Sequence, residues 1–180
     1  MTEETGIIRA VLEGDTESFR LLVQRYQKPV IRMIANLIND RHVCEDIAQE
    51  VFLAAYKKLP AFDPARSSFS TWLFTIAKNK SINAVKKKRI LPAVNPPENH
   101  DFTEPVDTLI QDELFFKLDQ ALKSLNPEHR RAIVLAEFEN LPYEQIAQIE
   151  GVRLGTIKSR VSRAKHRLKS VLDGIYGDNK

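Results

Sequence analysis

Apolar residues recur at intervals of three and four along most of the chain, whereas the two-residue alternation of a half-buried strand is absent. We therefore predict an all-α fold. The first long apolar stripe follows Gly14, where Asp15 can cap a helix. Pro29 lies inside this stripe and is expected to kink or break the helix near Tyr26 to Lys28, because proline removes a backbone hydrogen bond and clashes with the preceding turn.

A second helix is predicted from about His42 to Leu59, with apolar residues on one face and polar residues on another. The polar face carries Asp46, Gln49 and Glu50, and by composition such a patch is more often a solvated face than a binding surface. His42 and Cys44 point to different sides of this helix. No second pair of metal-ligating residues lies near them in the sequence, so no metal site is predicted.

A third helix is predicted after the proline-containing break at residues 60–64, with Ser68 or Ser70 as its cap. Its beginning carries Phe69 and Trp72, and its later part is the basic run KNKSINAVKKKR. Aromatic side chains among cations and amides are suited to stacking on unpaired bases while neutralising phosphates. Phe69 and Trp72 are more often core residues in such a position, whereas the basic run favours a nucleic-acid-binding face.

A proline-rich stretch, ILPAVNPPENHDFTEPVD, follows at residues 90–107 and has no helical period, so we interpret it as an extended linker between two domains. Helical spacing resumes at about Asp112. Asn126 followed by Pro127 then indicates a cap and first turn of a further helix. The predicted organisation is a first small helical domain at residues 1–90, a flexible linker at residues 91–110 and a second small helical domain at residues 111–176.

The stretch from Leu141 to Leu168, LPYEQIAQIEGVRLGTIKSRVSRAKHRL, has the layout of a helix-turn-helix. Pro142 suits a first helical turn, and Gly151 is expected to end that helix because glycine tolerates the left-handed conformation of a sharp turn. The following helix is strongly amphipathic. Its apolar stripe is Leu154, Ile157, Val161, Ala164 and Leu168, and its polar remainder includes Thr156, Lys158, Ser159, Arg160, Ser162, Arg163 and Arg167.

Charge favours a polyanionic partner for this amphipathic helix. Seven Lys or Arg and no acidic residue lie from Arg153 to Leu172. A recognition helix places short polar and arginine side chains of its N-terminal half against base edges in the major groove, and later cations meet phosphates. An ordinary solvated basic helix is the alternative, but the preceding helix and turn favour DNA. A second acid-free basic block lies between Asp63 and Glu98, so two contacts with one nucleic acid are expected.

The composition of the 180 residues, with 43% hydrophobic and 28% charged side chains, is typical of a soluble globular protein. The N-terminus lacks a basic and apolar signal region, and no apolar run approaches the roughly 20 residues that span a bilayer, so a cytoplasmic location is expected. No glycine-rich phosphate loop, HExxH or GxSxG motif occurs, and the four histidines are scattered. We therefore predict no enzyme activity, catalytic residue, cofactor or small-molecule substrate.

Over nearly its whole length, from about Gly6 to Leu172, the chain resembles the bacterial sigma factors of the extracytoplasmic-function group. GDTESFRLLVQRYQ at residues 14–27 looks like the family's opening helix, and DIAQEVFLAAYKKL at residues 46–59 looks like its polymerase-binding helix. FSTWLFTIAKNKSINAVKKKR at residues 69–89 looks like its promoter-melting segment, and the helix-turn-helix looks like its second-domain reader. Each motif is moderately specific, but the ordered set with a proline-rich stretch between is strongly specific.

The resemblance implies a dissociable subunit that binds core RNA polymerase and directs it to promoter DNA. It further implies a role in an envelope or other stress response under an anti-sigma factor, which in this group is typically membrane-bound. It assigns core polymerase binding to Asp46, Ile47, Gln49, Glu50 and Phe52; the minus-ten element to Trp72, Lys78, Asn79, Lys80, Asn83, Lys86 and Lys87; and the minus-thirty-five element to Thr156, Lys158, Ser159, Arg160, Ser162, Arg163 and Arg167.

Two positions depart from the family's pattern. Arg153 stands where the family commonly has proline, and Pro142 stands where many members have a serine cap. Arg153 can change how the recognition helix starts and adds a charge near the DNA, but neither position is among those that read bases. The rival interpretation is a regulator whose helix-turn-helix binds a palindromic operator as a homodimer, without polymerase, while its first domain senses a ligand.

Overall fold

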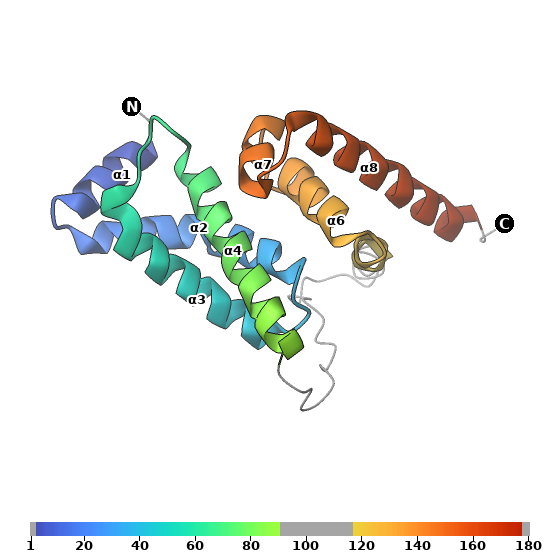
Figure 1. The fold of residues 1–180 in the computed structure, drawn as a ribbon, viewed down its shortest axis with the longest axis horizontal. Coiled ribbons are helices and arrows are strands. Elements are labelled where there is room, and N and C mark those ends of the chain that lie inside the picture. Colours follow the sequence, from blue (N-terminus) through green and yellow to red (C-terminus); the bar gives the residue numbers. More distant parts are fainter. Residues whose placement is uncertain (1–2, 91–116, 178–180) are drawn as a thin grey trace. The chain divides into compact units, whose positions relative to one another are not determined.

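The computed structural model describes residues 3–90 and 117–177, which fall largely into an N-terminal and a C-terminal compact unit. Each unit is described by itself. The regular elements within these ranges are all helical (Figure 1), which confirms the all-α prediction. The predicted linker at residues 91–110 and the helix start near Asp112 lie outside the described residues. No helix in the described ranges is long and apolar enough to cross a membrane.

The first unit consists of four α-helices and two short 3-10 turns. In chain order these are α1 (Glu3–Leu12), η1 (Thr16–Ser18), α2 (Phe19–Ala35), α3 (Arg41–Lys58), η2 (Leu59–Ala61) and α4 (Phe69–Ile90).

Helix α1 was not among the predicted elements, because it is short and buries only Ile8 and Val11. Side-chain contacts hold it to α2. The Arg25 guanidinium pairs with Glu3 at 2.6 Å, and the Tyr26 hydroxyl donates a hydrogen bond to Glu4. Tertiary contacts of this kind stabilise a helix that is too short to persist alone.

Short polar side chains cap three helical segments of the first unit. The sequence predicted the caps at Asp15 and Ser68, but Asp15 caps the turn η1 directly before α2, and α2 itself has no side-chain cap. Asp15 accepts a hydrogen bond from the Ser18 amide at 3.3 Å, and Ser68 accepts one from the Thr71 amide at 3.2 Å. Asp40 caps α3 through the Val43 amide at 3.1 Å. Each cap supplies an acceptor to an N–H group in a first helical turn, where the helix itself leaves amides without partners.

Helix α2 runs without interruption through Pro29, so the expected break near Tyr26 to Lys28 does not occur. Proline deletes only one hydrogen bond of the helix ladder. The residues around it stay helical because Leu22, Val30 and Ile34 are fully buried on either side of the proline. Packing of this stripe therefore outweighs the local penalty.

The core of the first unit lies between α2, α3 and α4, which pack against one another in all three pairs (Figure 1). Helix α3 contributes Val51 and Ala55, and α4 contributes Leu73 and Phe74, all essentially inaccessible to solvent. Each large apolar side chain buried in this way stabilises the fold by about 1.5–3 kcal/mol. Burial of one stripe on every helix leaves the opposite faces of α3 and α4 for partners.

The second unit begins with helical residues 117–123 and continues through α6 (Pro127–Ile133), a π-helical turn (Val134–Phe138), α7 (Tyr143–Glu150) and α8 (Leu154–Gly177). The predicted cap at Asn126 is confirmed, because its side chain accepts a hydrogen bond from the Glu128 amide at 3.0 Å. The helix that follows widens at its end, where the Glu139 amide bonds to the Val134 carbonyl at 3.2 Å.

Cys44 lies in the core of the first unit with no exposed surface, and its Sγ approaches the Ile38 carbonyl oxygen at 3.3 Å. Burial raises the pKa of this thiol to about 12, with smaller contributions from Asp40 and Glu45. Because the folded-state pKa is raised, the stabilisation from burying the neutral thiol is complete below about pH 9 and is lost as the pH rises toward 12.

We predict that Cys44 reacts with a thiol reagent about a thousandfold more slowly in the folded chain than in urea at pH 8, because its thiolate fraction falls by that factor. Labelling kinetics followed by absorbance measure both rates. Equal rates in the two states would contradict the burial of this thiol.

Candidate nucleic-acid interface

The turn between α7 and α8 has the predicted left-handed glycine. Gly151 has a φ of 70°, and the amides of Gly151 and Val152 both bond to the Ala147 carbonyl, at 2.9 and 3.1 Å. The two bonds give the Ala147 carbonyl oxygen its partners at the helix end, where the chain reverses within three residues. Gly151 therefore ends the first helix of the helix-turn-helix as expected.

The two positions that depart from the family pattern both lie at helix starts. The Pro142 carbonyl accepts the first helical bond of α7 from the Ile146 amide at 3.1 Å, so Pro142 precedes the first turn and does not lie within it as predicted. The Arg153 carbonyl accepts a bond from the Thr156 amide at 2.9 Å and occupies the same place before α8. Neither residue supplies a side-chain acceptor to the first helical amides.

Helix α8 buries one stripe and exposes the other faces, as its amphipathic pattern predicts. Ile157, Val161 and Ala164 are almost completely buried. Ala164 belongs to a cluster with Leu125 and Ile133, against which the partly buried Leu168 also packs. The polar side of the helix is thereby fixed toward solvent over most of its length.

The predicted minus-thirty-five residues do not all occupy the same environment. Thr156 is half-buried, and Ser159 donates a hydrogen bond to the Thr156 carbonyl at 2.9 Å. Arg160 is largely covered, with 13% of its side chain exposed, and it pairs with Glu128 of α6. The remaining residues of the set are exposed: Lys158, Ser159, Ser162, Arg163 and Arg167.

The basic half of α4 carries the predicted minus-ten residues on a continuous helix. Asn79 and Asn83 are exposed, as are Lys86 and Lys87 near the helix end, whereas Lys78 is half-buried. Lys80 pairs with Glu50 of α3 at 2.8 Å. The ion pair joins a residue predicted to meet DNA to one predicted to meet polymerase, which is a juxtaposition that the sequence does not reveal.

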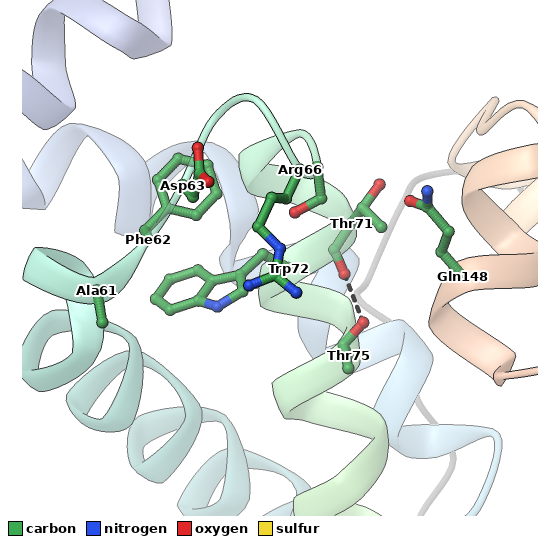
Figure 2. A pocket seen from close by; sticks show the side chains of 9 residues that line it. Ala61, Phe62, Asp63, Arg66, Thr71, Trp72, Thr75 and Gln148 are labelled. Atoms are coloured by element: carbon green, nitrogen blue, oxygen red, sulfur yellow. Dashed lines mark hydrogen bonds between the residues drawn. The ribbon is translucent and has the colours of Figure 1, made fainter.

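Trp72 lies in an aromatic group at the start of α4. Its ring centroid is 5.2 Å from that of Phe62 and 5.8 Å from that of Phe69. Phe69 is buried and Trp72 is half-buried, so only the tryptophan and Phe62 are open to a ligand. Figure 2 shows Trp72 beside Phe62 and the Arg66 side chain. Phe62 was not predicted, because it lies in a loop and only the fold brings it beside Trp72.

The predicted polymerase-binding residues on α3 divide into two groups. Asp46, Gln49 and Glu50 are exposed on one side of the helix. Ile47 and Phe52 have 6% and 8% of their surface exposed and belong to the core. Two exposed apolar side chains on the same helix were not predicted: Leu53, with 54% of its surface exposed, and Tyr56.

An all-helical chain with a basic recognition helix in one unit and a basic helix in the other defines a DNA-binding protein of the helix-turn-helix class. The family model described as sigma-70 region 2 matches residues 22–90, and that described as sigma-70, region 4, matches residues 115–168. The chain belongs to the sigma-70 family of RNA polymerase sigma factors, in the extracytoplasmic-function group.

Curated relatives and solved structures agree with this family. The chain is 30% identical to RNA polymerase sigma-H factor of Pseudomonas aeruginosa, over 96% of the chain and 95% of the relative. It is also 30% identical to the ECF sigma factor SigW of Bacillus subtilis, over 92% and 94%. The sigma factor RpoE of Bartonella quintana, solved with the anti-sigma factor NepR, superposes with a TM-score of 0.73 at 27% identity, covering 87% of this chain and 98% of that one.

Replacement of Gly151 by alanine is expected to destabilise the chain by about 1 kcal/mol, because its φ of 70° lies where a Cβ is strained. Gly155 is the matched control. It lies in α8, its added Cβ would meet nothing within 4 Å, and Gly155→Ala should stabilise by about 0.5–1 kcal/mol. Urea unfolding followed by circular dichroism measures both changes. Shifts of the same sign would contradict this account of the turn.

Proposed function

We propose that this chain binds core RNA polymerase and directs it to promoters by contacting the DNA through both units. The observation that carries the proposal is the match to sigma-70 regions 2 and 4 in order along one chain. The proposed division is residues 1–90 for polymerase binding and the minus-ten element, 91–110 for the linker and 111–176 for the minus-thirty-five element.

Core polymerase binding is assigned to the exposed face of α3. Asp46, Gln49 and Glu50 offer carboxylates and an amide to a partner, and the exposed Leu53 adds apolar area beside them. Ile47 and Phe52 would contribute indirectly, because their burial in the core orients the helix that carries the polar residues. A mixed surface of this kind is typical of reversible protein interfaces.

The minus-ten element is assigned to α4. Asn79, Asn83, Lys86 and Lys87 are exposed and provide amides and cations to a DNA strand. Trp72 supplies a half-exposed ring on which an unpaired base can stack, at a gain of about 1–3 kcal/mol per base. Lys78 and Lys80 belong to the same set. Such stacking offsets the cost of unpairing the duplex, which is a few kcal/mol.

The minus-thirty-five element is assigned to α8 in the major groove. The exposed side opposite the buried stripe consists of Lys158, Ser159, Ser162 and Arg163. In the proposed complex these side chains reach base edges and phosphates. Arg167 lies one turn further on and suits a phosphate. Thr156 and Arg160 complete the predicted set.

The polymerase supplies the catalytic chemistry in this proposal, and the chain supplies binding energy, so no catalytic residue, cofactor, metal or small-molecule substrate is assigned to it. The chain would act in the cytoplasm, where promoter DNA lies. An anti-sigma factor is proposed as its regulator in an envelope or other stress response, by analogy with the Bartonella quintana factor solved with such a partner. We propose that this regulator is membrane-bound, as is typical of the group, and its recovery from the membrane fraction of cells is the test.

Reversal of charge at Asp46 tests the polymerase-binding face. We expect Asp46→Lys to reduce holoenzyme formation at least tenfold, because it presents a cation where the partner meets a carboxylate. Co-purification with core polymerase and transcription from a promoter that core alone does not use are the two measurements. Glu13→Lys is the control, since Glu13 is also an exposed acid but lies outside α3, and its reversal should have no effect. Binding by Asp46→Lys equal to that of the control would reject this face.

Salt dependence tests the DNA contacts. With about six phosphate contacts, promoter affinity of the holoenzyme should fall by about a thousandfold between 50 and 200 mM salt, since counterions are released on binding. Arg163→Gln should reduce the slope of log affinity against log salt by about one if this arginine meets a phosphate, and should relax base preference if it reads a base. Specific duplex binding without polymerase, at a palindromic site, would favour the homodimeric regulator instead.

A further inference from the structure

One ion pair ties the recognition helix to α6. The Arg160 Nη2 donates to the Glu128 carboxylate, and the two residues come from helices that pack against each other within the second unit. Arg160 keeps 13% of its side-chain surface exposed, whereas Glu128 keeps 55%. The arginine is therefore the enclosed member of the pair, and its partner Glu128 lies in the first turn of α6.

The position of Arg160 on α8 explains this enclosure. At 3.6 residues per turn, Arg160 lies about 60° around the helix from the fully buried Ile157, whereas Arg163 lies about 120° from it and Ser159 about 160°. Arg160 thus borders the packed stripe, while the exposed Ser159 and Arg163 lie on the far side.

A second ion pair holds the opposite border of the buried stripe. Lys165 donates to Glu137 of the π-helical turn at 2.8 Å. Lys165 is exposed, however, so its pair with Glu137 is solvated and contributes little to stability. In the pair of Arg160 with Glu128 the cation is largely buried, so the geometry of this pair is more constrained than that of Lys165 with Glu137.

We infer that Glu128 is a positioning residue for minus-thirty-five recognition, holding Arg160 against α6 so that Arg160 fixes the rotation of α8 and does not itself contact DNA. This inference rests on the proposed function of α8 as the promoter reader. The inference removes Arg160 from the set of residues that contact DNA, because its guanidinium pairs with a carboxylate of its own chain. Rotation of α8 about its axis would move Ser159 and Arg163 away from their bases.

The test exchanges the two charges in the full chain bound to core polymerase. The probe is a pool of promoter duplexes randomised over the minus-thirty-five element, from which bound sequences are recovered and read. We expect the single variants Glu128→Arg and Arg160→Glu to lose base preference, because each places like charges side by side. The double variant, with both substitutions, restores the pair in reverse and should select the same bases as the unmodified chain.

A second variant measures DNA contact directly. Arg160→Gln should leave the salt slope unchanged, whereas Arg167→Gln, at the arginine proposed to meet a phosphate, should lower it by about one. Glu137→Gln is the matched control for loss of an ion pair to α8 and should retain both slope and base preference. Thermal unfolding by circular dichroism reports the folding of each variant, and if the double variant is unfolded the slope of Arg160→Gln decides.

Two results would overturn the inference: a double variant as defective as Arg160→Glu alone, or a salt slope that Arg160→Gln lowers by about one, as Arg167→Gln does. Either would place Arg160 on the DNA. Failure of the proposed function has a different signature, since the unmodified chain would then select no sequence from the pool with core polymerase present.

Discussion

Burial of one apolar stripe on α8 is the constraint on which the second unit depends. Ile157, Val161 and Ala164 are withdrawn from water, and the packed cluster around Ala164 fixes the rotation of the helix about its axis. Because side chains at 100° intervals are rigidly related, fixing this stripe also fixes which residues face outward. The polar surface of α8 is thus set first by its packing, and the pair between Arg160 and Glu128 adds a second restraint on its rotation.

The first unit applies the same constraint to three helices at once. Helices α2, α3 and α4 each bury one stripe in a shared core, so α3 and α4 retain an outer face. The outer face of α3 carries the exposed acids Asp46 and Glu50, the outer face of α4 carries lysines, and the pair between Glu50 and Lys80 joins the two. The proposed polymerase face and the proposed DNA face therefore meet at this ion pair.

Ion pairs in this protein differ in what they contribute because they differ in burial. The exposed pairs, such as Lys165 with Glu137, contribute little to stability, because both side chains remain solvated whether or not they pair. Arg160 is enclosed, and an enclosed arginine needs a carboxylate because an uncompensated charge out of water is costly. Because Arg160 is enclosed, its pair with Glu128 restrains the position of α8 relative to α6.

The sequence by itself determined the helical class, the capped helix starts, the turn at Gly151 and the outward residues of α8, because each depends on spacing within a few residues. It did not determine α1, the uninterrupted α2 through Pro29, or the pairing of Trp72 with Phe62. It also placed Arg160 among DNA-reading residues without indicating Glu128, which lies 32 positions earlier. Only the tertiary structure decides such contacts, since they arise where helices distant in sequence pack together.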